Sequence, residues 1–278
     1  MADASVPRSA GPSLHGKQSP ANAMKIVVIG GNGLVGSKLV QRLRRDGHQP
    51  LAASPRSGVN AFTGEGLDSA LEGAQVVVDV SNTPSSNGVA VLEFFQTSSR
   101  NLLAAETAAG VVHHVTLSVV GIDRLPDSGY FRAKVAQEEA VKVGPVPYTI
   151  LRAAPFFEAI GRIADSSTDG DTVRLPHTVV QPEAADDVAS TLADVAIGSP
   201  LNDTVELAGP EVFRLGELVR RVLEASDDPR QVTIEVHARC CGAELDDRSL
   251  TPRDDARIAS TLFDDWLSQS KMTPTRPC

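Results

Sequence analysis

The sequence lacks three features that each mark a class of protein. It has no run of about 18 uninterrupted apolar residues, which a membrane-spanning helix would need. It has no cluster of Lys and Arg, and its formal net charge of −9 disfavours a surface for nucleic acid, because such surfaces hold phosphates with clustered positive charge. Its three cysteines make no disulfide framework. We therefore expect a soluble, cytoplasmic protein that binds neither nucleic acid nor membrane directly.

The two ends of the chain differ in composition from the middle. Residues 1–23 are rich in Ser, Pro, Gly and Ala and show no periodicity, so we expect a disordered leader. Met24 directly precedes the first predicted strand and is a candidate natural start. Residues 270–278 are expected to be a frayed tail. The length of the part between them, residues 24–269, suits one compact domain.

From Met24 onward, short β-branched runs alternate with longer stretches of helical periodicity. Such alternation is typical of a parallel sheet built from strand-helix-strand units. The apolar run from Val76 to Val80 predicts a buried central strand, and the stretch from Val89 to Ala109 predicts a long helix. We count six strands up to Leu151. The predicted fold class is α/β, with a doubly wound parallel sheet.

Beyond Arg152 the alternation becomes less regular. We expect residues 24–152 to form a cofactor-binding core and residues 153–269 to form a small α/β elaboration on the substrate side. Further elements are predicted as short strands at 171–175 and 204–207 and as helices at 184–196, 215–225 and 254–268.

A glycine-rich turn joins the first predicted strand to the first predicted helix. Gly30, Gly33 and Gly36 allow a tight turn, close approach of a pyrophosphate to the backbone, and close packing of the helix on the strand. The N-terminus of the helix adds unpaired N–H groups and the positive end of its dipole. In this context the pattern predicts a Rossmann-type dinucleotide site, although a purely structural turn is the alternative. The residues assigned to the phosphates are Gly30, Asn32, Gly33, Leu34, Val35 and Gly36.

No acidic residue stands where a protein that selects NAD usually holds the adenosine ribose. That Asp or Glu lies about 20 residues after the turn, yet none occurs between Asp46 and Glu65. Ser54, Arg56 and Ser57 stand in this region instead, and a guanidinium pairs well with a 2′-phosphate. We therefore expect NADP(H) to be preferred over NAD(H). The alternative is that Arg56 is a solvated loop charge.

Three further residues form a candidate catalytic group. Ser118 ends a predicted strand, and Tyr130 and Lys134 stand four residues apart on one face of the following helix. The pKa of a free phenol is about 10, and a neighbouring ammonium lowers it by stabilising the phenolate. Lys134 can do this for Tyr130 and contact the nicotinamide ribose, while Ser118 hydrogen-bonds a substrate carbonyl. Alternatively, Tyr130 is a packing residue and Lys134 is a ribose ligand only.

Taken together, these motifs resemble the atypical short-chain dehydrogenase/reductases, and in particular the NmrA-like NAD(P)H-binding group. The resemblance covers nearly all of the chain from Met24 to Gln269. The motifs that carry it are the glycine turn, Leu117-Ser118-Val119-Val120-Gly121, Tyr130 to Lys134, Tyr148-Thr149-Ile150-Leu151-Arg152, Asp186-Asp187-Val188-Ala189 and Leu207-Ala208-Gly209-Pro210.

The resemblance also implies contacts that the residues alone do not indicate. It implies that Phe156, Phe157 and the region around His177 face the substrate. The residues that it places against the cofactor, in addition to Ser118 and Lys134, are Val80, Ser81, Asn82, Ala153, Ala154, Pro155 and Phe156.

Members of this family include both enzymes and redox-sensing regulators that bind the dinucleotide without turnover, often without the tyrosine. Because this chain keeps Tyr130 and Lys134, we expect an NADPH-dependent oxidoreductase. It would reduce a carbonyl or a conjugated double bond of a small molecule, with Tyr130 as proton donor. The alternative is a non-catalytic NAD(P)-binding sensor with a protein partner. A third interpretation, an epimerase or dehydratase with tightly held NAD, agrees less well with the missing ribose acid.

We expect no metal site. His237 with the adjacent Cys240 and Cys241 makes an incomplete ligand set for zinc.

Overall fold

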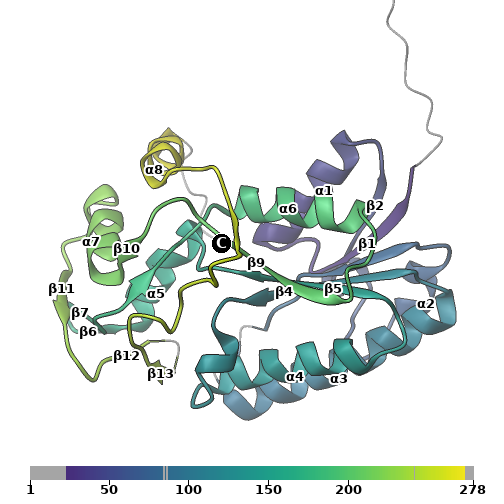
Figure 1. The fold of residues 1–278 in the computed structure, drawn as a ribbon, viewed down its shortest axis with the longest axis horizontal. Coiled ribbons are helices and arrows are strands. Elements are labelled where there is room, and N and C mark those ends of the chain that lie inside the picture. Colours follow the sequence, from purple (N-terminus) through teal and green to yellow (C-terminus); the bar gives the residue numbers. More distant parts are fainter. Residues whose placement is uncertain (1–22, 84, 86, 241, 273–278) are drawn as a thin grey trace, which may run out of the picture.

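A computed structural model describes residues 23–83, 85, 87–240 and 242–272. Seven parallel strands form its main sheet, in the order β14-β9-β5-β4-β3-β1-β2 (Figure 1). The strands are β1 (Lys25–Ile29), β2 (Gln49–Ala53), β3 (Val76–Asp79), β4 (His113–Val119), β5 (Tyr148–Ala153), β9 (Asp203–Ala208) and β14 (Arg257–Ile258). Among the inner strands, β1 and β3 are mostly apolar and buried on both faces, as in parallel sheets covered by helices, whereas β4 and β5 also bury polar side chains.

Helices cover both faces of this sheet (Figure 1). On one face α1 (Leu34–Arg45) packs beside α6 (Ala185–Ile197). On the other face α3 (Gly88–Ala109) packs beside α4 (Gly129–Val143) and α2 (Leu67–Leu71). This layered arrangement confirms the predicted Rossmann-type α/β fold class.

Alternation along β1 shows how the sequence separates the two layers. Side chains of successive strand residues point to opposite faces. Ile26 and Val28 therefore belong to the core that contains Leu39 of α1, whereas Val27 belongs to the core that contains Leu102 of α3.

The order of the strands reverses between β1 and β3. From β1 the chain crosses to β2 on one side and then returns to β3 on the other side. In open α/β sheets, ligands bind beyond the carboxyl ends of the strands at such a reversal. The turn at residues 30–33 follows β1 and the segment at residues 80–82 follows β3, so both flank this position.

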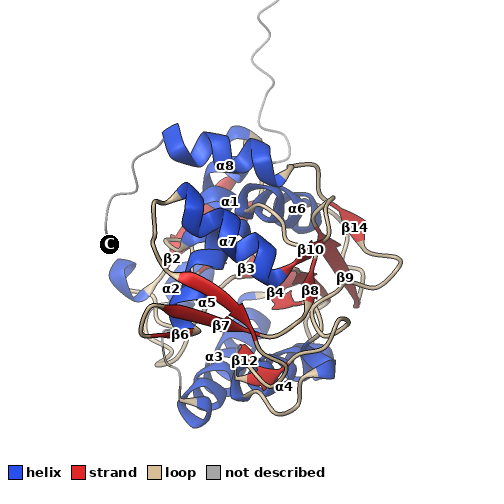
Figure 2. Cartoon of the chain, turned by 90° about the vertical axis from the view of Figure 1, so that its left-hand side faces the viewer, coloured by secondary structure: helices blue, strands red, loops and turns tan. Residues whose placement is uncertain are grey.

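The remaining elements form a smaller unit at one end of the main sheet (Figures 1 and 2). Phe157, Phe263 and Trp266 pack in its core, with ring centroids 5.3 to 5.8 Å apart. Its elements are η3 (Phe157–Ala159), α5 (Ile160–Ser166), α7 (Leu215–Ala225), α8 (Phe263–Met272), β6 (Thr168–Asp169), β7 (Thr172–Leu175), β8 (Val179–Val180), β10 (Phe213–Arg214), β11 (Gln231–Ile234), β12 (Arg239–Cys240) and β13 (Ala243–Glu244). Two further 3-10 helices, η1 (Pro55–Ser57) and η2 (Ile122–Arg124), follow β2 and β4.

Two predicted elements differ from the structure. The chain up to Ala153 forms five strands and not six. Between the second and third of them, residues 58–66 fold back through a hydrogen bond from Asn60 N to Glu65 O (2.8 Å). The predicted helix at 254–268 begins only at Phe263, because Arg257–Ile258 pairs with β9 as strand β14.

The main sheet also extends beyond the expected cofactor core of residues 24–152. It takes β9 and β14 from the second half of the chain, and α6 covers one of its faces. The expected leader (1–23) and tail (270–278) lie largely outside the described residues. Among the helices that are described, none has the length and apolar character needed to cross a membrane.

Candidate functional site

The glycine turn after β1 leaves no room for side chains. Gly30 has a φ of +79°, and a Cβ atom there would lie 2.8 Å from Val80 O. A Cβ atom on Gly36 would lie 2.2 Å from Gly30 O. Gly33 is the N-cap of α1 and no side chain caps this helix, so its first amide groups lack a side-chain acceptor. The helix N-terminus is therefore available to an anion.

A first cavity of about 340 Å³ opens beside this turn, at the carboxyl ends of β1, β3 and β4. Its lining combines the turn, the segment after β3, and all three candidate catalytic residues. The residues that line it are Gly30, Asn32, Gly33, Leu34, Val35, Gly36, Ser54, Val80, Ser81, Asn82, Leu117, Ser118, Val119, Tyr130, Lys134, Phe156 and Arg162.

Of the three residues proposed to select the cofactor, one lines this cavity and two lie outside it. Ser54 lines the cavity, and its Oγ accepts a hydrogen bond from Asn32 Nδ2 (2.6 Å). Ser57 lies outside the lining, where its Oγ accepts a hydrogen bond from Ser54 N (2.9 Å). Arg56 also lies outside the lining and is exposed on η1. Within the described chain Arg56 has no ion-pair partner, so its guanidinium is available to a ligand.

Lys134 is almost fully buried beneath the first cavity. Its Nζ donates to Leu117 O (2.8 Å) and to Gln137 Oε1, and Gln137 Nε2 donates to Asp79 Oδ2 (2.9 Å). Burial lowers the pKa of Lys134 to about 8, although the charge of Asp79 opposes this shift. Because an ammonium carries three N–H groups, one remains for a molecule in the cavity.

Two hydroxyl groups at the cavity are buried without a partner. The Oγ atoms of Ser81 and Ser118 form no hydrogen bond within geometric limits to any described residue. Ser118 Oγ nevertheless lies near enough to Glu138 to lower the pKa of that carboxyl. Because buried hydroxyls in proteins normally have partners, these two atoms indicate positions for polar groups of a ligand.

Tyr130 is the second residue of α4 and is half-buried. Its ring packs edge-on against Phe95 of α3, with centroids 6.3 Å apart. The beginnings of α3 and α4 are close, since a Cβ atom on Gly129 would lie 2.8 Å from Gly88 Cα. The N-cap Ser128 accepts a hydrogen bond from Phe131 N (3.4 Å) and fixes where α4 begins. These contacts hold Tyr130 at the cavity.

A second cavity of about 340 Å³ adjoins the first. Six residues line both cavities: Asn82, Ser118, Val119, Tyr130, Phe156 and Arg162. The other residues of its lining are Phe131, Ala153, Ala154, Pro155, Ala159, Ile163, Ser166 and Leu250. Ala153, Ala154 and Pro155, which the family resemblance assigns to the cofactor, thus lie on the side of the second cavity.

The resemblance also places Phe157 and His177 on the substrate side, but these two residues are not part of the lining of either cavity. Phe157 is 1% exposed and packs against Phe263 and Trp266 in the core. Because Phe156 has extended backbone angles, its side chain and that of Phe157 point in different directions. His177 lies in a separate depression with Arg214.

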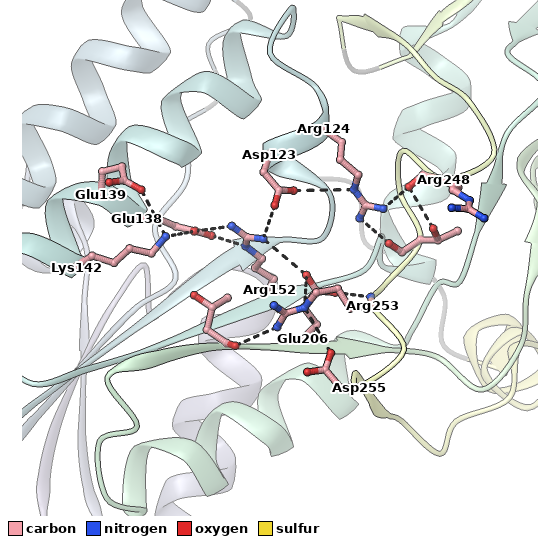
Figure 3. Close-up of polar contacts among 12 residues, drawn as sticks. Asp123, Arg124, Glu138, Glu139, Lys142, Arg152, Glu206, Arg248, Arg253 and Asp255 are labelled. Atoms are coloured by element: carbon pink, nitrogen blue, oxygen red, sulfur yellow. Dashed lines mark hydrogen bonds and ion pairs between the residues drawn. The ribbon is translucent and has the colours of Figure 1, made fainter.

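A network of charged side chains centred on the buried residues Arg152, Glu138 and Glu206 was not part of the site expected from the sequence (Figure 3). Arg152 pairs with Ser118 in the register of β4 and β5, and its Nε and Nη2 atoms donate to Glu138 (2.9 and 2.8 Å). These hydrogen bonds outweigh the effect of burial and keep the pKa of Glu138 below its ordinary value. Glu206 also lies near Arg152 (3.7 Å) and accepts a hydrogen bond from Arg253 N (2.7 Å).

This network connects the sheet to residues 246–255, which we call the strap. Arg124 of η2 donates to Arg248 O and Thr251 O (2.7 Å for the second). A Cβ atom on Gly121 would lie 2.0 Å from Ser249 O, so the loop after β4 packs directly on the strap. Charged residues inside apolar strands, such as Arg152, were the sequence signal for this network.

Glu183 is a second buried carboxyl, below the loop that follows β5. Its Oε1 accepts a hydrogen bond from Ala154 N (2.9 Å), while Oε2 has no partner among the described residues. Burial raises the pKa of Glu183 to about 9, and the charges of Asp187 and Glu158 add to this effect. The folded protein therefore keeps Glu183 protonated at neutral pH.

We expect Glu183→Gln to be more stable than the wild type at pH 8 and similar to it at pH 5. Between the ordinary glutamate value of 4.5 and about 9, the folded state holds a proton that the unfolded chain has released. The free energy of unfolding of the wild type therefore falls as pH rises, by about 1 kcal/mol per pH unit. Glutamine does not titrate and lacks this slope. Urea denaturation across this pH range measures the difference, and parallel profiles for the two proteins would contradict the buried proton.

The described residues contain no group of three or more His, Cys, Asp and Glu arranged to hold a metal ion. Cys241, one of the three residues considered for a metal from the sequence, lies outside the described residues.

Comparison of the sequence with known proteins finds distant relatives. No family model matches the chain. It is similar to the photosystem II assembly factor Ycf39 of Cyanophora paradoxa, with 22% identity over 76% of this chain and 71% of that protein. It is also similar to Ycf39 of Synechocystis sp., with 26% identity over 71% of this chain and 66% of that protein.

Comparison of the structure finds solved enzymes with a similar fold. The dTDP-glucose 4,6-dehydratase DesIV of Streptomyces venezuelae, solved with NAD and TYD bound, is similar with a TM-score of 0.69 and 16% identity, over 90% of this chain and 96% of that chain. A dTDP-4-dehydrorhamnose reductase of Clostridium acetobutylicum has a TM-score of 0.64 and 16% identity, over 90% and 98% of the two chains. The UDP-N-acetylglucosamine 4-epimerase of Bacillus cereus has a TM-score of 0.60 and 20% identity, over 77% and 85%. The chain thus shares the Rossmann-type α/β fold of these enzymes, which is the fold that the sequence resemblance implies.

Proposed function

We propose that the chain is an NADPH-dependent oxidoreductase that reduces a carbonyl or conjugated double bond of a small molecule. One observation carries this proposal: a single cavity joins the uncapped N-terminus of α1 to Ser118, Tyr130 and Lys134. A protein that only bound the dinucleotide would need the turn but would not need the tyrosine.

The residues of the first cavity suit a dinucleotide. Its glycine turn allows phosphates to approach the backbone, where a Cβ atom on Gly30 or Gly36 would collide with other backbone atoms. The unpartnered hydroxyl groups of Ser81 and Ser118 offer hydrogen bonds to a bound molecule. When bound, NADPH would supply the hydride for reduction.

Side chains of this protein would supply the proton that the reduction requires. Tyr130 would donate the proton of its Oη to the reduced substrate, and the ammonium of Lys134 would stabilise the phenolate that remains. Leu117 O and Gln137 hold the Lys134 ammonium in place. Ser118 would donate a hydrogen bond to the substrate oxygen and thereby stabilise the charge that develops there.

The preference for NADP(H) rests on Arg56. We expect Arg56→Ala to weaken NADPH binding at least about ten-fold and NADH binding less than about two-fold, because only NADPH carries the 2′-phosphate. The measurement is a fluorescence titration with each cofactor. Arg44→Ala is the matched control, since Arg44 is an exposed arginine of α1 outside the cavity. Equal losses for the two cofactors in Arg56→Ala would contradict the 2′-phosphate contact.

A second candidate function is a non-catalytic NAD(P)-binding protein that acts on a protein partner. The names of the two Ycf39 relatives favour it, because they describe assembly factors and not enzymes. Such a protein would bind NADPH without consuming it and would change its affinity for the partner with the oxidation state of the cofactor.

A turnover screen separates the two candidates. Purified protein with NADPH is incubated with series of aldehydes, ketones, quinones and enones, and the loss of NADPH absorbance is followed. We expect oxidation with at least one of these classes. Tight binding of NADPH with no oxidation on any compound would favour the sensor.

A further inference from the structure

The second cavity has an apolar wall and one positive charge. Most of its lining is apolar, including Phe131, Pro155, Ile163 and Leu250, and its one cation is Arg162. Among the described residues that line either cavity, none is Asp or Glu. The whole chain has a formal net charge of −9. The charged side chains in the described lining of the two cavities are thus Lys134 and Arg162, both cationic, which favours an anionic ligand.

Arg162 forms no ion pair with the acidic residues near it in the described chain. Glu158 stands four residues before it, but the Glu158 carboxylate accepts a hydrogen bond from Ala185 N (3.1 Å). Asp165 stands three residues after it, but pairs with Arg230 (2.9 Å). In the part of the chain that the structure describes, the guanidinium of Arg162 has no hydrogen bond or ion pair. Its five N–H groups are thus available to a ligand.

Arg162 lines both cavities, whereas the glycine turn lines only the first. No residue of the turn lines the second cavity, whereas Tyr130 and Ser118 line both cavities together with Arg162. A molecule in the second cavity would therefore contact Arg162 and the candidate catalytic residues at the same time.

The strap contributes one residue to the wall of the second cavity. Leu250 lines the second cavity, and its backbone bridges to Val180. On either side of Leu250, the hydrogen bonds from Arg124 hold Arg248 O and Thr251 O. A segment with its own anchors thus forms part of the cavity wall, as in preformed ligand sites.

We propose that the second cavity binds the substrate and that this substrate is an apolar molecule carrying one anionic group, which Arg162 holds. A guanidinium binds a carboxylate or sulfonate through two parallel hydrogen bonds, and the apolar lining would cover the remainder of the molecule. This inference rests on the proposed function, because it names the class of molecule that would be reduced beside Tyr130.

Two dyes with one aromatic framework test the proposal. 1-Anilinonaphthalene-8-sulfonate carries a sulfonate, and N-phenyl-1-naphthylamine is the same framework without it. Both are titrated by fluorescence against protein saturated with NADPH, so that the first cavity is occupied. We expect Arg162→Gln to weaken binding of the sulfonate about ten-fold and of the neutral dye less than two-fold. Arg162→Lys, which keeps the charge, should recover most of the affinity.

Arg100→Gln is the matched control, because Arg100 is an exposed arginine of α3 outside both cavities. Unchanged sulfonate binding in Arg162→Gln would overturn the proposal, as would an equal loss for the two dyes. Weaker binding of NADPH itself in Arg162→Gln would also overturn it and would assign Arg162 to the cofactor. Failure of the wild type to bind NADPH is a separate result, because it contradicts the proposed function and is seen before any dye is added.

Discussion

Gly36→Ala is expected to weaken NADPH binding at least about 100-fold, or about 2.7 kcal/mol. The new methyl group would lie 2.2 Å from Gly30 O and 2.7 Å from Gly31 Cα, both of which are backbone atoms. The turn must move away from α1 to admit it, and the amides that would hold the phosphates then lose their alignment. Isothermal titration with NADPH measures the loss.

Two further variants control for damage to the fold. Gly161→Ala adds the same methyl group to helix α5, where nothing lies within 4 Å, and should leave NADPH binding and stability nearly unchanged. Gly33→Ala places its methyl group 3.3 Å from Gly30 O, at the cavity itself, so it should weaken binding without unfolding the protein. Normal NADPH affinity in both Gly36→Ala and Gly33→Ala would show that the turn does not hold the phosphates.

Tyr130→Phe should reduce the rate of NADPH oxidation by a factor of about 100 to 10,000, which is the usual contribution of a positioned general acid. Phenylalanine keeps the ring contacts with Phe95 and Phe131 and removes only the hydroxyl group. The affinity for NADPH and the melting temperature should therefore remain close to those of the wild type. The rate is measured as the loss of NADPH absorbance, with the compound for which the turnover screen first detects oxidation.

The other tyrosine of the chain supplies the control. Tyr148 begins β5 and lines neither cavity, so Tyr148→Phe should oxidise NADPH at the wild-type rate. Full activity in Tyr130→Phe would show that Tyr130 is not the proton donor. Loss of NADPH binding in the same variant would instead show that Tyr130 is needed for the site to form.

Parts of the site that depend on local sequence could be predicted. The glycine turn lies between a strand and a helix that are consecutive in the chain, so the residue pattern fixes its geometry over a few residues. Tyr130 and Lys134 are neighbours on one turn of α4, and the helix spacing alone places them on one face. The structure brings these residues to one cavity with Ser118.

The parts that depend on distant contacts could not be predicted. Arg162 belongs to a short helix whose place is set by packing against α7 in the smaller unit, and no local pattern distinguishes it from a solvated arginine. Glu206 and Arg253 meet only because β14 adds to the main sheet after the strap. Phe157 was assigned to the substrate side by resemblance alone. Because the backbone at Phe156 is extended, the side chain of Phe157 points into the core instead.

The most direct measurement is a titration of the purified protein with NADPH, NADP, NADH and NAD by isothermal calorimetry. Any cofactor retained from purification is first identified by absorbance and removed. We expect one NADPH to bind per chain, at least about ten-fold more tightly than NADH. Absence of binding by all four dinucleotides would contradict the assignment of the first cavity, and with it the proposed reductase.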